Sequence, residues 1–443
     1  MKKNDELILE CTDLSDLGFG ICHKDGLTIF VSNLLPGEEA RVRLIKLAKS
    51  WAIGKVMERL RTSKQRVEPK CDKAGICGGC ALMHLAPDAQ LEYKEKQLKH
   101  LFQDVDPAIQ VLPVLGMEDP YYYRNKAQFP VGIQNGKVVG GFYRPKSNTI
   151  VPVEECKIQS KAINEVYRWL MDHLSPEQAE HLRHILLRSS KKTGQIQVVF
   201  IGRKNIGLQK TTDELVQAFP AVKSVVFNEN HRDDNVILGE DYQVLYGSDS
   251  IEEGCLDLRI HLHFKSFFQV NPDQMEVLYS KALEMADLKP DDRVIELYSG
   301  TGTIGLLAAG KAGHVTGVEI VPEAVENAKQ NQALNNIENA EFVCMDATDF
   351  VESNKLPADV VLIDPPRKGM SRQGIKDVAA LEPKRIVYIS CNPRTLARDL
   401  KEFLNKGYFC SVIQPVDMFC HTTGVECIAL LSQNRPEKEQ KEK

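Results

Sequence analysis

The sequence lacks the features of a membrane or secreted protein. No apolar run in its 443 residues approaches the ~18 residues that a membrane-spanning helix requires. The first residues are polar and charged, and no apolar segment with a small-residue cleavage site follows them. No internal repeat is evident either. We therefore expect a cytoplasmic protein that makes no membrane contact.

A disulfide framework is also not expected, although the chain has 12 cysteines. The cytosol keeps thiols reduced, so metal binding and catalysis become the leading roles for cysteine here. Seven cysteines outside any recognisable site are interpreted as packing residues: Cys11, Cys22, Cys255, Cys344, Cys410, Cys420 and Cys427.

An overall basic charge is likewise missing, since the formal net charge is −5. One stretch is an exception. Between Arg41 and Lys73, 11 Lys or Arg residues stand against 3 acidic residues, which leaves a local charge of +8. A basic face of this kind suits RNA, and a solvated charged surface explains it equally well.

The chain length predicts two or three domains. From Leu7 to about Arg61, short alternating stretches separated by turn signals are typical of a small all-β barrel, so residues 1–62 form the first predicted domain. Residues 63–265 contain a cysteine-rich loop and an α+β pattern that includes a helix at Lys161–His173.

The last third of the chain has a different pattern. In residues 266–433, short apolar runs alternate with helical stretches, which predicts a mostly parallel α/β sheet covered on both faces. Residues 434–443 have no apolar content and are expected to be disordered.

A cofactor site is predicted at the start of this α/β region. The strand ending at Tyr298 leads into a glycine turn at Gly300 and then into a helix, and the next strand ends in Glu319. A glycine turn lets the backbone approach a ligand, and the carboxylate can accept ribose hydroxyls. Nicotinamide dinucleotides and S-adenosylmethionine both fit this pair. The Asp364-Pro365-Pro366 loop after the fourth strand favours the methyl donor, because class I methyltransferases carry such a loop there.

Two further residues indicate covalent chemistry. Cys391 follows the fifth strand, at the carboxyl edge where open α/β sheets place ligands, and the N-terminus of a helix near Pro393 should favour its thiolate. Glu426 is a carboxylate inside an apolar strand, where burial would raise its pKa and make it a proton acceptor. A salt-bridged structural Glu is the alternative.

Together these segments resemble one family over nearly the whole chain, the RNA uracil-5 methyltransferases that act on large-subunit ribosomal RNA or tRNA. The resemblance includes a TRAM-like (OB-like) barrel followed by Ser63-x-x-Arg66-x-x-Pro69-x-Cys71. It also includes the segments Phe267-Phe268-Gln269-Val270-Asn271, Asp364-Pro365-Pro366-Arg367, Ser390-Cys391-Asn392-Pro393 and Val425-Glu426.

The resemblance implies a multidomain protein with a class I S-adenosylmethionine-dependent, Rossmann-like methyltransferase domain. It implies that Gln269, Tyr298, Glu319 and Asp364 line the S-adenosylmethionine site. It further implies that Cys391 attacks C6 of uracil and that Glu426 removes the C5 proton. Among possible substrates we prefer 23S rRNA, naked or in an early assembly intermediate, and we expect a monomer.

The cysteines Cys71, Cys77 and Cys80, with glycines between them, form a tight ligand loop, and Cys156 could supply a fourth thiolate. Cysteine identity alone leaves four-thiolate zinc and iron–sulfur open. The family resemblance implies a [4Fe-4S] cluster, for which we expect a structural role.

Candidates for stacking on RNA or contacting its phosphates follow from the same segments. They are Tyr122, Tyr123, Arg124, Asn125, Lys126, Phe267 and Phe268. A packed aromatic hairpin is as good an interpretation of the tyrosines.

Two positions depart from the family pattern. Gly424 stands where many members have His, which predicts a roomier or differently tuned pocket beside Glu426. Ser299 stands where members often have Cys. The rival functions are a cytosine-5 methyltransferase and a non-catalytic RNA-binding protein. The position of Cys391 after the fifth strand argues against the first, and intact Cys391 and Glu426 argue against the second.

Overall fold

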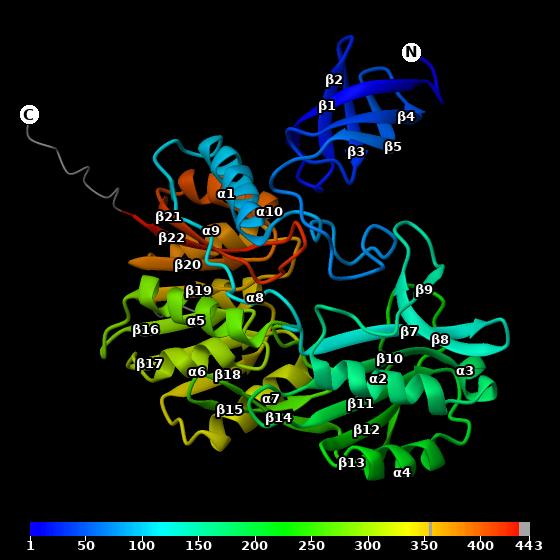
Figure 1. Ribbon diagram of the computed structural model, residues 1–443. Coiled ribbons are helices and arrows are strands. Elements are labelled where there is room, and N and C mark those ends of the chain that lie inside the picture. The colour runs from blue at the N-terminus through cyan, green and yellow to red at the C-terminus, as the bar shows by residue number, and fades with distance from the viewer. Residues whose placement is uncertain (354–356, 434–443) are drawn as a thin grey trace, which may run out of the picture.

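The computed structural model describes residues 1–353 and 357–433. Figure 1 shows a barrel at the N-terminal end of the chain, a seven-stranded sheet and an eight-stranded sheet. No helix within the described ranges is long and apolar enough to cross a membrane. The predicted disordered tail, residues 434–443, lies outside the described residues.

The N-terminal barrel is closed, as the alternating pattern predicted. Its strands pair in the order β1-β2-β3-β5-β4, and only β3 and β5 run parallel. Alternate side chains point inward and form a small core around Ile29, Val31 and Val42. The strands are β1 (Glu6–Leu14), β2 (Gly20–Lys24), β3 (Leu27–Ser32), β4 (Glu39–Leu47) and β5 (Trp51–Arg61).

The barrel is tied to the segment that follows it by one buried carboxylate. Glu38 is fully buried and accepts hydrogen bonds from the guanidinium of Arg66 (2.6 and 2.8 Å) and from the backbone N–H groups of Leu35 and Ser63. Burial alone would raise the pKa of Glu38, but these donors outweigh it and lower the pKa to about 2. The Ser63-x-x-Arg66 motif therefore fixes the exit from the barrel.

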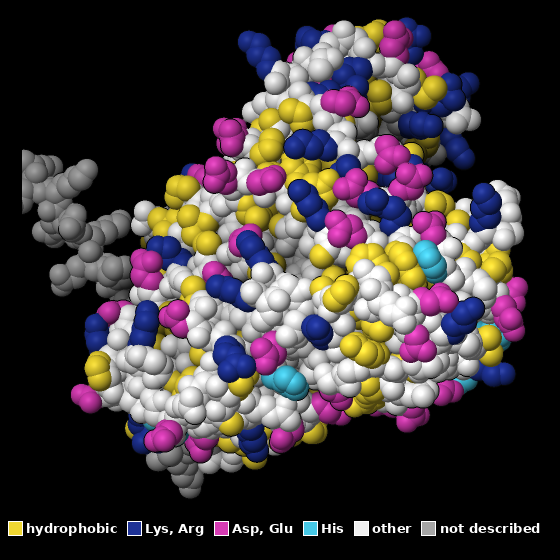
Figure 2. All heavy atoms as spheres, turned by 60° about the horizontal axis from the view of Figure 1, so that its bottom comes forward, with side chains coloured by type: hydrophobic (Ala, Val, Ile, Leu, Met, Phe, Trp, Pro, Cys, Tyr) yellow, Lys and Arg dark blue, Asp and Glu magenta, His cyan; other side chains and the backbone are white. Residues whose placement is uncertain are grey.

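The basic stretch of residues 41–73 is partly neutralised, which the sequence count did not show. Its arginines reach glutamates, several of which lie outside the counted stretch, because strand pairing brings distant residues together. Figure 2 shows Lys and Arg interspersed with Asp and Glu over the barrel. The ion pairs are Arg41–Glu58, Arg43–Glu6, Arg59–Glu38, Arg61–Glu10 and Arg66–Glu38.

The middle of the chain forms a seven-stranded sheet in the order β13-β12-β11-β10-β7-β8-β9. Helix α2 (Lys161–His173) begins and ends where the sequence predicted. The strands are β7 (Lys126–Gln134), β8 (Lys137–Tyr143), β9 (Ile150–Pro152), β10 (Leu182–Ser189), β11 (Ile196–Gly202), β12 (Val222–Glu229) and β13 (Tyr242–Gly247). Helices α3 (Pro176–His181) and α4 (Leu208–Ala218) complete this part, and β14 (Ser250–Cys255) pairs with β15 (Leu258–His263).

The last third forms an eight-stranded sheet in the order β18-β17-β16-β19-β20-β22-β21-β6. From β18 to β20 the strands run parallel, and β22 is antiparallel to both β20 and β21. The strands are β16 (Arg293–Leu297), β17 (His314–Glu319), β18 (Ala340–Cys344), β19 (Val360–Ile363), β20 (Arg385–Ser390), β21 (Phe409–Val416) and β22 (Glu426–Ser432). Its helices are α5 (Pro272–Ala286), α6 (Thr303–Ala309), α7 (Pro322–Leu334), α8 (Ala347–Ser353), α9 (Arg372–Ala380) and α10 (Pro393–Leu404).

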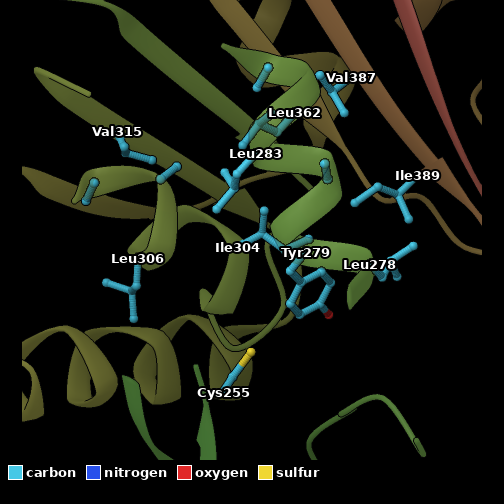
Figure 3. Close-up of a cluster of buried hydrophobic side chains, with 14 of the residues drawn as sticks. Cys255, Leu278, Tyr279, Leu283, Ile304, Leu306, Val315, Leu362, Val387 and Ile389 are labelled. Carbon is cyan, nitrogen blue, oxygen red and sulfur yellow. The ribbon is translucent and has the colours of Figure 1, made fainter. Parts of the chain in front are cut away.

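Helices cover both faces of this sheet, as expected for a sheet whose strands are apolar throughout. One core joins α5 and α6 to the sheet, and Figure 3 shows Tyr279, Leu283 and Ile304 within it. A second core lies on the opposite face, between the sheet and α9 and α10, and includes Val378, Leu400 and Phe403.

The outer edge of the eight-stranded sheet comes from an unexpected part of the chain. Residues 63–265 were assigned to the central region, but within that range β6 (Gln110–Val111) pairs with β21. Helix α1 (Pro87–Gln103) packs near α10, and its Leu98 and Phe102 join the second core of the sheet. A strand of two residues carries no readable pattern, which is why the sequence did not reveal this crossing.

The seven cysteines interpreted as packing residues are buried, with one exception. Cys344 is exposed, and the interpretation is wrong there. It is the last residue of β18, where the strand leaves the covered part of the sheet.

Candidate functional site

Cys391 lies between two regular elements. Strand β20 ends at Ser390, and Asn392 caps α10 by accepting the backbone N–H of Arg394 at 3.2 Å through its side chain. The single residue between them is held at the carboxyl edge of the sheet with its side chain only partly buried. The sequence predicted this position.

Glu426 is the first residue of β22, and the strand register brings it to Cys391. Ser390 pairs with Cys427 in the antiparallel pairing of β20 and β22, so the next residue along β20 meets the preceding residue of β22. Glu426 is 2% exposed. Burial, then the nearby carboxylate of Asp364, raise the pKa of Glu426 to about 8, and Arg367 opposes them. This agrees with the predicted effect of burial.

The predicted effect on the thiol is wrong. The pKa of Cys391 is raised, first by burial and then by the charge of Glu426, while Arg367 lowers it. Cys391 lies before the capping residue, and the N-terminus of α10 is not among the causes that lower its pKa. Arg367 is therefore the group that favours the thiolate.

The loop that carries Arg367 is fastened to α10. The side chains of Asn392 and Thr395 donate to the backbone carbonyl of Arg367 at 3.1 and 3.2 Å. Further along the loop, Asp399 accepts the backbone N–H of Met370 at 2.9 Å. The Asp364-Pro365-Pro366-Arg367 loop and the segment after Cys391 are thus one connected unit.

Asp364 stands at the end of β19 and is the third member of this group. Burial raises its pKa to about 7, and its charge raises the pKa of Cys391 and Glu426. Three buried or partly buried acidic groups with raised pKa values beside one exposed arginine form a setting for proton transfer near neutral pH.

Gln269 lies in the segment between β15 and α5, where its side chain and Asp364 both neighbour Tyr279. Gln269 is 4% exposed, and its backbone carbonyl accepts the side-chain N–H of Asn125 at 3.3 Å. The backbone N–H of Asn125 bonds the carbonyl of Val270 at 2.9 Å. Asn271, two residues after Gln269, caps α5, and its side-chain amide donates to the backbone carbonyl of Met418 at 3.2 Å. The Gln269 segment therefore joins the two large sheets.

The glycine turn after β16 is sharply bent. Tyr298, Gly300 and Gly302 have φ of 64°, 53° and 77°, a left-handed conformation that suits glycine. A Cβ on Gly302 would lie 2.6 Å from the ring of Phe342, whereas a Cβ on Gly300 would meet no atom within 4 Å. The backbone therefore borders open space at Gly300.

Glu319 turns its carboxylate toward this opening. Its Oε2 accepts the backbone N–H of Gly300 at 3.0 Å, and its Oε1 accepts the N–H groups of Ile320 and Val321. Tyr298 lies close by. Burial, then nearby charges that include those of Asp346 and Glu319, raise the pKa of Tyr298 to about 12. The predicted residues Tyr298, Gly300 and Glu319 thus lie together.

Sequence reasoning missed one carboxylate of this site. Glu296 on β16 is 2% exposed, and its Oε2 has no hydrogen-bond partner. Burial, then Asp364, hold the pKa of Glu296 well above its ordinary range. The same signal that marked Glu426, a carboxylate inside an apolar strand, could have found it. Asp346 and Arg367 were also missed.

These residues fit S-adenosylmethionine. The open space at Gly300 and the carboxylate of Glu319 offer room and an acceptor for a ligand with hydroxyl donors.

Gly424 does not leave a roomier pocket beside Glu426. A Cβ at this position would lie 3.1 Å from the ring of Phe419 and 3.3 Å from the hydroxyl of Thr422. The space that a side chain would need is already occupied by the loop itself.

The predicted RNA-contacting aromatics separate into two groups. Tyr123 is buried and donates to the carbonyl of Cys420 at 3.1 Å, and Phe268 is 5% exposed, as in the packed-hairpin alternative. Phe267 is 68% exposed, and Tyr122 is half-buried with Lys157 and Lys161 beside its ring.

The four predicted metal-ligand cysteines line one cavity of about 380 Å³. Cys71, Cys77 and Cys80 come from the loop before α1, and Cys156 comes from the segment after β9. Burial raises the pKa of Cys77, Cys80 and Cys156, and the neighbouring thiols add to this.

Basic side chains also line this cavity. Arg124 and Lys126 belong to its lining, and the Nε of Arg124 is buried without a partner. Among the described residues, no group of three or more His, Cys, Asp or Glu side chains is arranged to hold a single metal ion. Four thiols surround this space together with four basic side chains and one carboxylate, namely Lys73, Arg124, Lys126, Lys157 and Glu155, and this surplus of basic groups suits an anionic occupant.

Comparison with known proteins shows similarity over the whole chain. Residues 86–434 match the family described as tRNA (Uracil-5-)-methyltransferase. An uncharacterized RNA methyltransferase of Bacillus cereus (strain ATCC 10987) is 43% identical, with 98% of each chain covered. One of Clostridium tetani is 40% identical, with 98% of this chain and 97% of that protein covered.

A solved structure has a similar fold. The crystal structure of Pyrococcus abyssi tRNA (uracil-54, C5)-methyltransferase in complex with S-adenosyl-L-homocysteine superimposes with a TM-score of 0.75 and 27% identity. The match covers 96% of this chain and all of that one.

Proposed function

Because the chain belongs to the tRNA (uracil-5-)-methyltransferase family and is an S-adenosylmethionine-dependent RNA methyltransferase, we propose that it forms 5-methyluridine through a covalent adduct on Cys391. The observation that supports this mechanism is the side-by-side position of Cys391 and Glu426 at the ends of β20 and β22. One supplies a nucleophile and the other a buried base.

The chemistry explains why both groups are needed. C5 of uracil is a weak nucleophile, and addition of the Cys391 thiolate at C6 turns it into the nucleophilic carbon of an enolate. Arg367 favours the thiolate that this addition requires. S-adenosylmethionine, when bound, supplies an electrophilic methyl group for C5.

Release of the product needs the second group. After methylation, C5 carries both the new methyl group and its original proton. Glu426 takes that proton on its carboxylate, the electron pair restores the C5–C6 double bond, and the C6–S bond breaks with its electrons returning to sulfur. The pKa of about 8 makes Glu426 a stronger base than an ordinary carboxylate.

RNA containing 5-fluorouridine tests this mechanism, because fluorine at C5 cannot leave as a proton. The wild-type protein should form an adduct with labelled RNA that survives denaturation, and Cys391→Ala should form none. An adduct with Cys391→Ala would assign the nucleophile to another residue. Cys427→Ala, at the next position of β22 from Glu426, is the matched thiol control and should retain the adduct.

We further propose 23S rRNA as the substrate, naked or in an early assembly intermediate, with the protein acting as a monomer. The preference rests on the TRAM-like barrel together with the four-cysteine cavity. The second candidate is tRNA. It is favoured by the description of the matching family and by the similar Pyrococcus abyssi enzyme, which covers 96% of this chain.

One assay separates the two substrates. Unmodified transcripts of 23S rRNA and of tRNA are incubated with methyl-labelled S-adenosylmethionine, and the labelled nucleotide is identified and mapped. Label in 5-methyluridine of 23S rRNA alone supports the proposal, and label in tRNA alone replaces it with the second candidate. Label in neither transcript would reject both.

We also propose that Cys71, Cys77, Cys80 and Cys156 hold a [4Fe-4S] cluster. Four thiols around one cavity, with basic side chains to offset negative charge, support it, and the preference over zinc rests on the family resemblance. Its role would be structural, because Leu82, two residues after Cys80, donates its backbone N–H to the carbonyl of His421 at 2.9 Å, in the loop before Glu426.

A further inference from the structure

We propose that the turn between β1 and β2, residues 15–18, forms one rim of the RNA entrance to the catalytic site, and that Leu17 packs on an RNA base beside the target uridine. The barrel would then act at the reaction centre itself. This inference rests on the proposed function, since it assigns a contact to the same RNA substrate.

The first observation is an ion pair between the barrel and the catalytic segment. Asp16, in the turn, pairs with Arg394, the second residue of α10. Arg394 follows Cys391 by three positions, so this contact places the turn at the segment that carries the nucleophile. Figure 1 shows the lower end of the barrel facing α1 and α10.

The second observation is the packing of Gly18 against the other catalytic segment. Gly18 has φ of 75°, and a Cβ there would lie 3.2 Å from the side chain of Thr423 and 3.1 Å from that of Leu82. Thr423 precedes Glu426 by three positions. The turn therefore touches both segments, the one after Cys391 and the one before Glu426.

The turn is also held rigidly. Tyr93 on α1 donates its hydroxyl to the carbonyl of Ser15 at 2.7 Å, and Gln97 donates to the carbonyl of Leu14 at 3.1 Å. Leu14 itself is buried in an apolar cluster with Leu35, Leu82 and Tyr93, which joins the barrel to α1. These hydrogen bonds and the apolar cluster fix the position of the turn relative to the catalytic segments.

Leu17 is the residue that this arrangement presents to solvent. It is 63% exposed, although Leu14 and Gly18 on either side are buried. A single exposed leucine elsewhere would need no explanation. Here it stands at the tip of a turn fixed between the two catalytic segments, where an unstacked nucleotide must pass.

The chemistry of the rim favours RNA as the partner. A uridine that reacts at C6 must leave its stack, which costs a few kcal/mol, and apolar side chains that replace the lost stacking offset this cost. Arg367 and Lys368 are exposed in the loop fastened to α10 and can meet phosphates. An apolar tip beside two cations matches a base beside its backbone.

Fluorescence gives the first test, and it does not depend on methylation. Leu17→Trp and the matched control Ile8→Trp each place an indole on the barrel, since Ile8 on β1 is 57% exposed. Titration with unmodified 23S rRNA and tRNA transcripts should quench the added emission of Leu17→Trp and leave that of Ile8→Trp nearly unchanged, after subtraction of the signal from the unsubstituted chain. Equal quenching at both positions, or none at either, would overturn the proposal.

Kinetics give the second test. We expect Leu17→Ser to raise the KM for the methylated RNA about ten-fold, while Ile8→Ser leaves it unchanged. The affinity for S-adenosylmethionine should be the same in all three proteins, which excludes a general structural effect. Equal KM values for Leu17→Ser and Ile8→Ser would contradict the contact. A wild-type protein that methylates neither transcript would instead reject the proposed function.

Discussion

The ammonium group of Lys94 lies 2.6 Å from the carboxylate of Asp417, and both side chains are almost fully buried. Lys94 is on α1, and Asp417 follows β21 at the start of the loop that leads to Glu426. The same ammonium donates to the carbonyl of Phe419 at 3.3 Å. The ion pair thus fastens the catalytic loop to a helix from a distant part of the chain.

Removing one member of this pair should be costly. In Lys94→Met the carboxylate of Asp417 would remain buried without compensation, and we expect the free energy of unfolding to fall by about 3–5 kcal/mol. Chemical denaturation at neutral pH measures this. Lys99→Met, which removes the exposed Lys99–Glu95 pair of the same helix, should cost less than about 1 kcal/mol. Similar losses in the two variants would contradict a buried pair.

The rate of product release should depend on pH through Glu426. Only the ionised carboxylate can accept the C5 proton, so the decay of the Cys391 adduct should rise with pH and level off above about 8. Rapid-quench measurement of the adduct at a series of pH values checks this. Glu426→Gln should accumulate the adduct at every pH. A plateau already reached at pH 5 would mean that the carboxylate titrates normally.

Glu38 has a pKa shifted down, whereas that of Glu426 is shifted up, and it should stabilise the protein down to a much lower pH. Its folded pKa of about 2 is below the ordinary value of 4.5, so its stabilisation is complete above pH 4.5 and is lost as pH falls toward 2. Glu38→Gln should therefore lower the free energy of unfolding by about 3 kcal/mol at pH 7 and by progressively less below pH 4.5. Denaturation curves of both proteins across this range give the difference. A constant difference would show that charge is not the cause.

Gly300→Ala tests whether the open space beside the glycine turn belongs to the methyl donor. The added methyl group meets no protein atom, so the free energy of unfolding should fall by only ~1 kcal/mol, from the φ of 53°. Affinity for S-adenosylmethionine, measured by calorimetry, should nevertheless fall about ten-fold or more. Gly136→Ala, also at positive φ with nothing within 4 Å, is the matched control and should bind normally.

The cysteine cavity predicts metal content. Protein purified without oxygen should be brown and hold about four irons per chain, whereas Cys80→Ser should lose most of them. Cys255→Ser, which changes a buried cysteine at the end of β14, should leave the iron content unchanged. A colourless wild-type protein with one zinc ion would replace the cluster with a single-ion site.

Much of this architecture could be predicted because its signals are local. The barrel strands alternate, the glycine turn needs left-handed backbone at Gly300 and Gly302, and Cys391 follows an apolar strand. Each of these is encoded within about ten residues, so no knowledge of the fold was required.

The parts that could not be predicted depend on residues brought together from afar. The arginines of the barrel find partners such as Glu6 and Glu38 through strand pairing, so a count along the chain overstated the basic charge. The pKa of Cys391 rises through burial and through the charges of Glu426 and Asp364 from other strands, which no local pattern shows. Burial of Glu426 was predictable, since its own strand is apolar.

The pairing of β6 with β21 constrains the order in which the strands of the catalytic sheet can pair during folding. Gln110 is paired with Val412, so the edge of the catalytic sheet is synthesised long before the strand that holds it. During translation, α1 and β6 must wait until almost the whole chain has left the ribosome, and long-range pairing of this kind is slow. We expect the catalytic sheet to be the last part to close, so a chain that stops before β21 would leave β6 without the strand it pairs with.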